Sequence, residues 1–222
     1  MEDVQLSYSQ QGQDLILLDL FRNYSKGIYV DIGCNDPIKL SNTYLFYKMG
    51  WSGIAIDAEY HFENKWIKYR KRDRFIDAAI SKIGGKINFY RFFDDTTSTT
   101  DETTMRRNKE NFGEVVEQLT VDSIPAEKIL IENDIPENFE LLCIDVEGKD
   151  HEVLESINLR KYRPKVILIE IKLFNFLQPK QSSIVNFLYQ QNYTMVVKTP
   201  LDGFFVDKSQ DLGWIPDQML KG

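Results

Sequence analysis

The sequence has few of the residues that hold disulfide-rich domains or metal centres together. It contains two cysteines and two histidines in 222 residues, and Cys34 and Cys143 lack a metal-binding spacing or a disulfide framework. It has no excess of positive charge either, because 34 acidic side chains outnumber 27 basic ones and the net charge is −7. We therefore expect no nucleic-acid partner. The basic cluster KYRKRDR at residues 68–74 is expected to be the solvated end of a helix.

Long apolar stretches are also missing. No run approaches the roughly 20 residues that a membrane-spanning helix requires, and the N-terminal MEDVQLSYSQQGQD lacks the basic and then apolar layout of a signal peptide. The hydrophobic content of 42% is ordinary for a globular protein. We therefore expect a cytoplasmic protein without a membrane span, folded as a single domain over residues 1–222. Nothing in the sequence indicates its oligomeric state.

Short runs of β-branched and apolar residues recur along the chain with little polar alternation. Such runs are typical of parallel strands that are covered on both faces. Between them lie apolar residues at helical spacing, such as Leu45 and Met49 behind the expected N-cap Ser41. The expected strands are residues 28–32, 53–57, 74–80, 141–146 and 165–171, followed by a hairpin of 193–198 and 203–207. The pattern predicts an α/β fold built from βαβ units, with an antiparallel hairpin at the C-terminal edge.

Two segments fall outside this alternation. Residues 1–25 are expected to form an N-terminal helical segment. Residues 94–113, DDTTSTTDETTMRRNKENFG, are rich in threonine and charge and poor in large apolar side chains. This composition is typical of a surface loop, and the alternative is a lid that becomes ordered over a substrate.

The first three expected strands end in an aspartate beside a small residue. Ligands of open parallel sheets bind at the carboxyl ends of the strands. Asp31 is followed by Gly33, which leaves room for a ligand near the backbone. Asp57 is placed to accept hydrogen bonds from both ribose hydroxyls of a nucleoside cofactor. Asp77 and Ala78 would then meet the amino group and the ring of adenine.

The glycine-rich loop of dinucleotide-binding proteins is missing. The stretch after the first strand, GCNDPI, contains one glycine in place of G-x-G-x-x-G. Asp31 and Asp36 would repel a pyrophosphate and attract the cationic sulfur and ammonium of S-adenosylmethionine. That cofactor therefore fits better than NAD. A nicotinamide-dependent oxidoreductase and a non-catalytic domain of the same fold stay open as alternatives.

Several longer motifs resemble the FkbM family of S-adenosylmethionine-dependent methyltransferases. They are YSQQGQD, YVDIGCNDP, SNTYLFYKMGWSGIAID, DAAIS, CIDVEGKDHEVLESI and RPKVILIEI, in the family's order over residues 8–171. The resemblance implies a Rossmann-like class I methyltransferase sheet of seven strands, mostly parallel, with helices on both faces. It implies methyl transfer to a hydroxyl, often of a sugar in a glycan or metabolite, with S-adenosylhomocysteine as product. It also places Gln10, Asn35 and Asn42, which lie within the motifs, among the cofactor-binding residues.

The motif CIDVEG brings two carboxylates to the end of an expected strand. Asp145 and Glu147 would point the same way if the strand continued that far, with Asp145 facing the cofactor's amino group. Glu147 would then face the acceptor as general base or as hydrogen-bond acceptor, and Glu170 would add a third carboxylate. A divalent metal could bind such acids, but no spacing demands one, so an obligatory metal is not expected. His151 is expected to pair with Glu155 on the surface.

Overall fold

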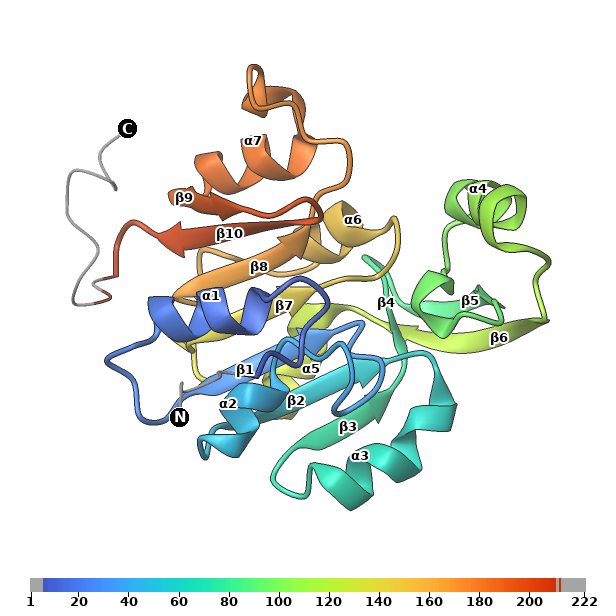
Figure 1. Ribbon diagram of the computed structural model, residues 1–222, viewed down its shortest axis with the longest axis horizontal. Coiled ribbons are helices and arrows are strands. Elements are labelled where there is room, and N and C mark those ends of the chain that lie inside the picture. The colour runs from blue at the N-terminus through green and yellow to red at the C-terminus, as the bar shows by residue number, and fades with distance from the viewer. Residues whose placement is uncertain (1–5, 211, 213–222) are drawn as a thin grey trace.

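Seven strands form one sheet in the order β3-β2-β1-β7-β8-β10-β9 (Figure 1). The structure is a computed structural model, and it describes residues 6–210 and 212. Strand β10 runs antiparallel to both of its neighbours, and the other pairings are parallel. This confirms the predicted Rossmann-like sheet with a reversed C-terminal hairpin. The strands are β1 Ile28–Ile32, β2 Ser52–Asp57, β3 Arg74–Asp77, β7 Leu141–Ile144, β8 Val166–Glu170, β9 Tyr193–Lys198 and β10 Asp202–Asp207.

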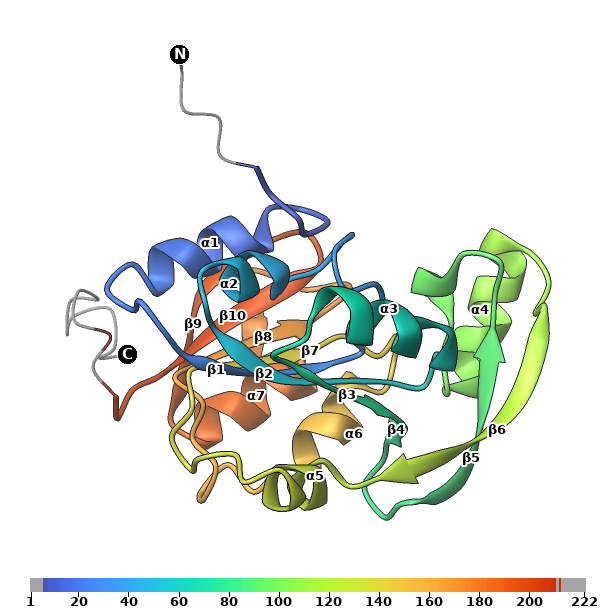
Figure 2. The same cartoon turned by 90° about the horizontal axis from the view of Figure 1, so that it is seen from below.

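Helices cover both faces of this sheet, as Figure 2 shows. One face carries α1 Gln13–Leu20, α2 Tyr44–Lys48 and α3 Glu63–Tyr69, and the other carries α5 Ala126–Glu132, α6 Asp150–Glu155 and α7 Ser183–Gln190. Every residue of the central strands β7 and β8 is buried. A strand that is covered on both faces cannot alternate polar and apolar residues, which explains the continuous apolar runs of the sequence.

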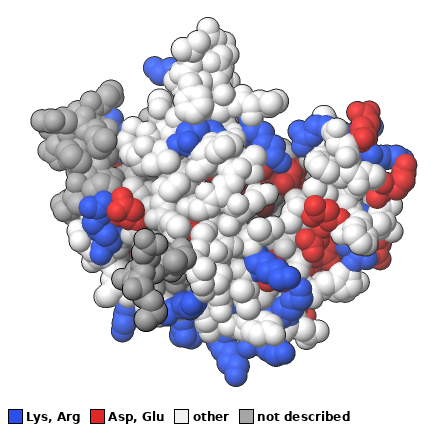
Figure 3. Space-filling model, viewed as in Figure 1, with Lys and Arg blue, Asp and Glu red and all other residues white. Residues whose placement is uncertain are grey.

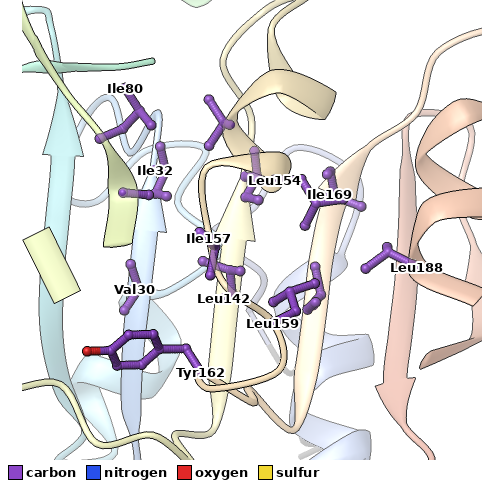
Figure 4. Close-up of a cluster of buried hydrophobic side chains, with 14 of the residues drawn as sticks. Val30, Ile32, Ile80, Leu142, Leu154, Ile157, Leu159, Tyr162, Ile169 and Leu188 are labelled. Carbon is purple, nitrogen blue, oxygen red and sulfur yellow. The ribbon is translucent and has the colours of Figure 1, made fainter. Parts of the chain in front are cut away.

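Successive side chains of β1 point into two different hydrophobic clusters on opposite faces of the sheet. Val30 and Ile32 pack with Leu142, Leu154 and other residues beneath α5, α6 and α7 (Figure 4). Tyr29 packs on the opposite face, against side chains of α1 and α2. Each large side chain buried in this way contributes about 1.5–3 kcal/mol. The two clusters pack the central strands on both faces, and the carboxyl ends of these strands form the edge where the acids of the sequence motifs lie.

A second, three-stranded sheet was not predicted. It has the order β4-β6-β5, with β4 Ala79–Ile80, β5 Gly85–Arg91 and β6 Glu117–Ile124. The expected strand 74–80 is therefore wrong in its second half, because the chain leaves the main sheet at Asp77 and joins the small sheet at Ala79. In β6 buried or partly buried positions alternate with exposed ones, as in an antiparallel ribbon with one solvated face.

The expected loop of residues 94–113 contains a helix, α4 Glu102–Phe112, and a short 3-10 turn, η2 Asp95–Thr97. Two aspartates explain these elements. Asp101 caps α4 by accepting a hydrogen bond from the Thr104 amide at 2.7 Å, and Asp94 caps η2 in the same way. In the N-terminal segment only Gln13–Leu20 is helical among the described residues. Helix α2 begins at Tyr44, so Ser41 is not its N-cap, although its hydroxyl accepts from the Tyr44 amide at 3.1 Å.

The basic cluster 68–74 is not solvated throughout, because Arg70 is fully buried. Its guanidinium donates to Asp73 at 2.7 Å, to the Tyr29 hydroxyl at 2.8 Å and to Thr43 at 3.0 Å. A buried charge is tolerated only when it is paired and hydrogen-bonded in this way. Arg70 therefore joins the end of α3 to Tyr29 of β1 and to Thr43, which precedes α2. No helix among the described residues is long and apolar enough to span a membrane.

Candidate active site

A cavity of about 710 Å³ opens at the carboxyl ends of β1, β2, β7 and β8. Residues 94–100 and α4 form another of its walls. Figure 3 shows acidic side chains along the junction between the main sheet and the part of the molecule that holds α4. The expected catalytic residues Asp145, Glu147 and Glu170 all line the cavity. The expected cofactor-binding residues that line it are Gln10, Asp31, Gly33, Asn35, Asn42, Asp57, Ala78 and Asp145.

Asp77 is the exception among the expected residues. It is absent from the cavity lining, and its side chain is exposed. Successive residues of a strand point to opposite sides, and the turn into the small sheet brings Ala78 and Ala79 to the cavity wall instead. The expected contact between Asp77 and an adenine amino group is therefore not supported.

Gly33 is a glycine because the chain itself passes close by. It adopts φ +79°, and a Cβ atom there would lie 1.7 Å from the backbone oxygen of Asp145. Only glycine tolerates both the left-handed backbone and such a close approach. Gly33 lines the cavity as expected, but the atom that excludes a side chain there belongs to Asp145, the residue after β7, and not to a ligand.

Asp31 is buried beneath the cavity floor and belongs to a polar network. Its Oδ2 accepts a hydrogen bond from the Thr43 hydroxyl at 2.7 Å, and Thr43 in turn accepts one from Arg70. Burial raises the pKa of Asp31 to about 6, although the Thr43 hydrogen bond and the Arg70 charge oppose this shift. The network fixes the carboxylate at the end of β1.

Asp57 at the end of β2 orders two loops that border the cavity. Its Oδ2 accepts from the Asn35 amide and its Oδ1 from the Glu59 amide, both at 2.8 Å. Burial raises its pKa, while these two hydrogen bonds oppose the change. Asp57 therefore also stabilises the loops after β1 and β2, a role that the sequence analysis did not predict.

Several buried oxygen atoms at this cavity accept no hydrogen bond from any described residue. They are Asn42 Oδ1, both carboxylate oxygens of Glu59, and Asp145 Oδ1. The Glu59 side chain is 4% exposed, and its nearest cation, Arg91, is 3.5 Å away. Buried acceptors without partners are costly and rare in native proteins. A ligand that brings hydroxyl, amino or ammonium donors would satisfy them.

Lys172 links the carboxylates on the other side of the cavity. Its ammonium donates to Glu147 Oε2 at 2.6 Å and lies 2.9 Å from Glu170 Oε1. Strand β7 ends at Ile144, so the strand alternation expected for Asp145 and Glu147 does not exist there. A turn with φ 53° at Glu147 takes its side chain to the cavity instead. Both acids line the cavity, but for a reason different from the one inferred from their spacing.

A divalent cation is the main alternative to a purely organic site. Carboxylate oxygens of Asp145, Asp150 and Glu170 lie within 4.8 Å of one another, and hard cations prefer such ligands. Asp150 already accepts hydrogen bonds from the amides of Val146 and Gly148 at 3.0 and 3.2 Å. These contacts leave Asp150 fewer free lone pairs for a metal. An obligatory metal therefore remains unexpected, and chelation by EDTA is the direct check.

The family of the chain follows from comparison with known proteins. A family model described as the methyltransferase FkbM domain matches residues 31–195. The chain belongs to the FkbM methyltransferase family. No curated protein and no solved structure matches it. Family membership implies S-adenosylmethionine as the usual methyl donor, and the matched range runs from the end of β1 into β9.

The FkbM domain holds α4 against the loop that carries Glu147. Thr99 donates a hydrogen bond from its hydroxyl to the Glu147 carbonyl at 2.7 Å. Gly148 has φ +107°, and a Cβ atom there would lie 2.3 Å from Thr104 Oγ1 on α4. Segment 94–113 is therefore packed directly on the loop between β7 and α6.

Two residues of the FkbM domain that the sequence patterns did not indicate belong to this cavity. Glu59 follows Asp57 by two residues in DAE, and Lys172 follows Glu170 by two in EIK. The spacing could have predicted a place for Glu59 near the cavity, because a residue two positions after the end of β2 lies close to the carboxyl edge of the sheet. Lys172 gave no signal, because its two partners come from different strand ends.

Burial raises the pKa of Glu170 to about 8, and the charges of Glu147 and Asp150 act in the same direction while Lys172 opposes them. Burial, and then the charge of Glu170, also raises the pKa of Asp145 well above its usual range. Two buried carboxyl groups this close together repel each other when both are ionised, so they lose their protons in coupled steps. The group is therefore poised to hold a proton near neutral pH.

This shift predicts that the protein loses stability as the pH rises. The pKa of Glu170 moves from an ordinary 4.5 to about 8 on folding. Between pH 4.5 and about pH 8 the unfolded state has released a proton that the folded state keeps. The contribution of Glu170 to the free energy of unfolding is therefore complete below pH 4.5 and is lost as the pH rises through about 8. Glu170→Gln should reduce the change in the free energy of unfolding over this pH range by on the order of a few kcal/mol.

Urea unfolding in EDTA over this pH range measures the effect. Glu155→Gln is the matched control, because Glu155 pairs with Lys82 at 3.5 Å on the surface and should leave the pH dependence unchanged. Equal pH slopes for wild type and Glu170→Gln would contradict the prediction.

Proposed function

We propose that this methyltransferase transfers a methyl group from S-adenosylmethionine to a hydroxyl group, namely that of a sugar in a glycan or a glycosylated metabolite. The observation that carries the proposal is the set of unpaired buried acceptors at the cavity, on Asn42, Glu59 and Asp145. A nucleoside with an amino acid tail brings the matching donors, which are two ribose hydroxyls, an adenine amino group and an ammonium. The resemblance to the FkbM family supports the sugar hydroxyl.

The residues present fit this cofactor. Asp57 and Glu59 would receive the ribose hydroxyls, and the small side chain of Ala78 would leave room for the adenine ring. Asp31 and Asp145 can accept hydrogen bonds from the ammonium, and the positive charge of the cofactor would favour the ionised form of both acids. When bound, S-adenosylmethionine supplies a methyl group on a cationic sulfur, which is reactive without further activation by the protein.

The protein's own task is to position the acceptor hydroxyl and to remove its proton. A base must lie within hydrogen-bond reach of that hydroxyl, and Glu147, which is 19% exposed at the cavity, can meet it. The Lys172 ammonium would hold the carboxylate in one orientation and could also donate to the acceptor oxygen. Glu170 shares Lys172 and would take up the proton or orient the lysine. A carboxylate pair with one ammonium therefore forms the acceptor side of the cavity.

Binding of the cofactor is tested by thermal unfolding with S-adenosylmethionine, S-adenosylhomocysteine and NAD in parallel. A ligand at about 100 times its Kd stabilises the folded state by about 2.7 kcal/mol, which corresponds to several degrees for a chain of this size. We expect shifts with both adenosyl ligands and none with NAD. A shift with NAD alone would favour the oxidoreductase alternative. Binding without transfer to any glycan or nucleotide sugar would favour the non-catalytic one.

Glu59→Gln is expected to weaken S-adenosylhomocysteine binding by about 10- to 100-fold. A hydrogen bond to a charged acceptor contributes about 1.5–3 kcal/mol. Neither Glu59 oxygen has a hydrogen-bond partner among the described residues, and only Oε1 is close to a cation, Arg91 at 3.5 Å. Calorimetry on the folded variant measures the loss. Glu63→Gln, on the exposed side of α3, is the control and should bind normally. Unchanged affinity in Glu59→Gln would remove this residue from the cofactor site.

A further inference from the structure

A second cavity of about 530 Å³ lies beside the first. It is bordered by α6, by residues 170–184 and by Arg107 of α4. The two cavities share Glu170, Lys172 and Leu173 as well as Arg107. A molecule in the second cavity therefore reaches the Lys172–carboxylate group from the side opposite β1 and β2, where the cofactor residues lie.

The lining of this second cavity is polar and mostly uncharged. It includes the amides of Asn175, Gln178 and Gln181 and the hydroxyls of Ser182 and Ser183. Asn175 uses its side-chain oxygen to accept from the Leu177 amide at 3.0 Å, which leaves its NH₂ group available. Ser182 accepts from the Val185 amide and keeps its hydroxyl proton as a donor. Such groups suit a ligand with many hydroxyls.

The charges at the border of the second cavity do not favour an anion. Asp150 and Glu170 are both acidic, and the Lys172 ammonium is already engaged by Glu147 and Glu170. Arg107 forms no ion pair with any described residue, so it is the cation still available there. One exposed arginine beside Asp150 and the acidic Glu147–Lys172–Glu170 group gives a phosphate or carboxylate ligand little net attraction.

His151 borders this cavity and carries an unsatisfied polar atom. It lines the cavity, and its ring packs edge-on against Phe187 with centroids 5.8 Å apart. Its Nε2 is buried and has no hydrogen-bond partner among the described residues. The expected surface pair with Glu155 is wrong, because Glu155 pairs with Lys82 and the imidazole turns toward α7. A buried ring nitrogen without a partner is unfavourable, and a ligand hydroxyl would satisfy it.

We propose that the second cavity binds the body of the acceptor and that the acceptor is a neutral polyhydroxylated compound, such as an uncharged sugar. One of its hydroxyls hydrogen-bonds His151 Nε2, and another reaches the Lys172–Glu147–Glu170 group. This inference rests on the proposed methyl transfer to a hydroxyl and adds the place and the charge class of the substrate. His151 is a binding residue in this arrangement, and the proton is removed elsewhere.

The chain offers a direct reporter, because His61 and His151 are its two histidines. Imidazole NMR signals of ¹⁵N-labelled protein are followed while methyl glycosides of neutral hexoses and deoxyhexoses are added, with and without S-adenosylhomocysteine. His61→Gln assigns the two signals. We expect the His151 signal to shift and saturate while the His61 signal stays. His151→Phe keeps a ring against Phe187 and should weaken glycoside binding by about five- to tenfold, without lowering the melting temperature.

The outcomes separate this inference from the proposed function. If S-adenosylhomocysteine does not stabilise the protein, the cofactor proposal fails, whereas a saturating glycoside shift at His151 would still uphold a sugar site. If S-adenosylhomocysteine binds and no neutral glycoside moves the His151 signal, the acceptor site is overturned. Saturation by glucuronate or a sugar phosphate, with neutral glycosides inactive, would overturn the neutral class.

Discussion

Glu147→Gln should lower the turnover of methyl transfer by about 10²–10⁴-fold, with S-adenosylhomocysteine affinity almost unchanged. An alcohol is a poor nucleophile while it keeps its proton, so a carboxylate that accepts this proton acts mainly in the transition state. Glutamine keeps the size of the side chain and can still accept a hydrogen bond from Lys172, but it cannot take up a proton. Transfer is measured at saturating S-adenosylmethionine with an acceptor found by screening glycans and nucleotide sugars.

Two further variants separate the roles of the neighbouring groups. Asp145→Asn should reduce cofactor affinity first, because the unpaired Asp145 Oδ1 belongs to the cofactor side of the cavity. Lys172→Met should reduce turnover as well, since both glutamates would lose the ammonium between them. Cofactor affinities are measured by calorimetry on each folded variant.

Near-normal turnover in Glu147→Gln would refute its role as the base. In that case Glu170, whose pKa is raised to about 8, becomes the base, and the pH profile tells the two apart. A base with this pKa gives activity that rises through about pH 8, and Glu170→Gln would abolish that rise. Loss of activity in EDTA with recovery in Mg²⁺ would instead place a metal among Asp145, Asp150 and Glu170.

The main sheet could be predicted from the sequence because its strands are covered on both faces. Strands such as β7 and β8 appear as unbroken apolar runs, and short runs of this kind are typical of buried parallel strands. The small sheet could not be predicted in the same way. Strands β5 and β6 carry exposed charged and polar residues on one side, and α4 depends on the Asp101 cap in a segment with almost no apolar face.

The candidate site was predicted where one strand end supplies the residue and missed where two distant segments combine. Asp31, Asp57 and Asp145 each follow an apolar run, so their position at the carboxyl edge follows from topology. Lys172 acts between Glu147 and Glu170, and Arg70 is buried between α3 and β1. Partners of this kind depend on the register of the folded chain, which local patterns do not encode.

The packing of α4 on the Glu147 loop leads to the second prediction of large effect, which concerns Gly148→Ala. A Cβ atom at this position would lie 2.3 Å from Thr104 Oγ1 and 3.2 Å from Thr104 Cβ. A rotation of the threonine side chain moves the oxygen but leaves the Cβ contact, and helical threonine has few rotamers. The variant must therefore move α4 away from the loop or shift the loop itself, together with Glu147.

Gly148→Ala should reduce methyl transfer by about 10²-fold or more, because a displacement on the order of 1 Å at a catalytic group has effects of that size. Cofactor binding should change less, since Asp31 and Asp57 lie at the ends of β1 and β2 and Glu59 lies in the loop after β2. The α4 segment would then act as a lid whose position sets that of the base. Turnover and S-adenosylhomocysteine affinity are measured on the same preparations.

Gly85→Ala is the matched control. Gly85 has a similar φ of +113° but nothing within 4 Å of its added Cβ. Both variants therefore place alanine at a positive φ, and only Gly148→Ala also clashes with α4. Gly85→Ala should therefore lose stability and keep transfer. The double variant Gly148→Ala, Thr104→Gly removes the clashing side chain and should recover part of the activity. If Gly148→Ala keeps full turnover, or if the double variant recovers none of a loss, α4 does not position the Glu147 loop and the lid role of residues 94–113 is refuted.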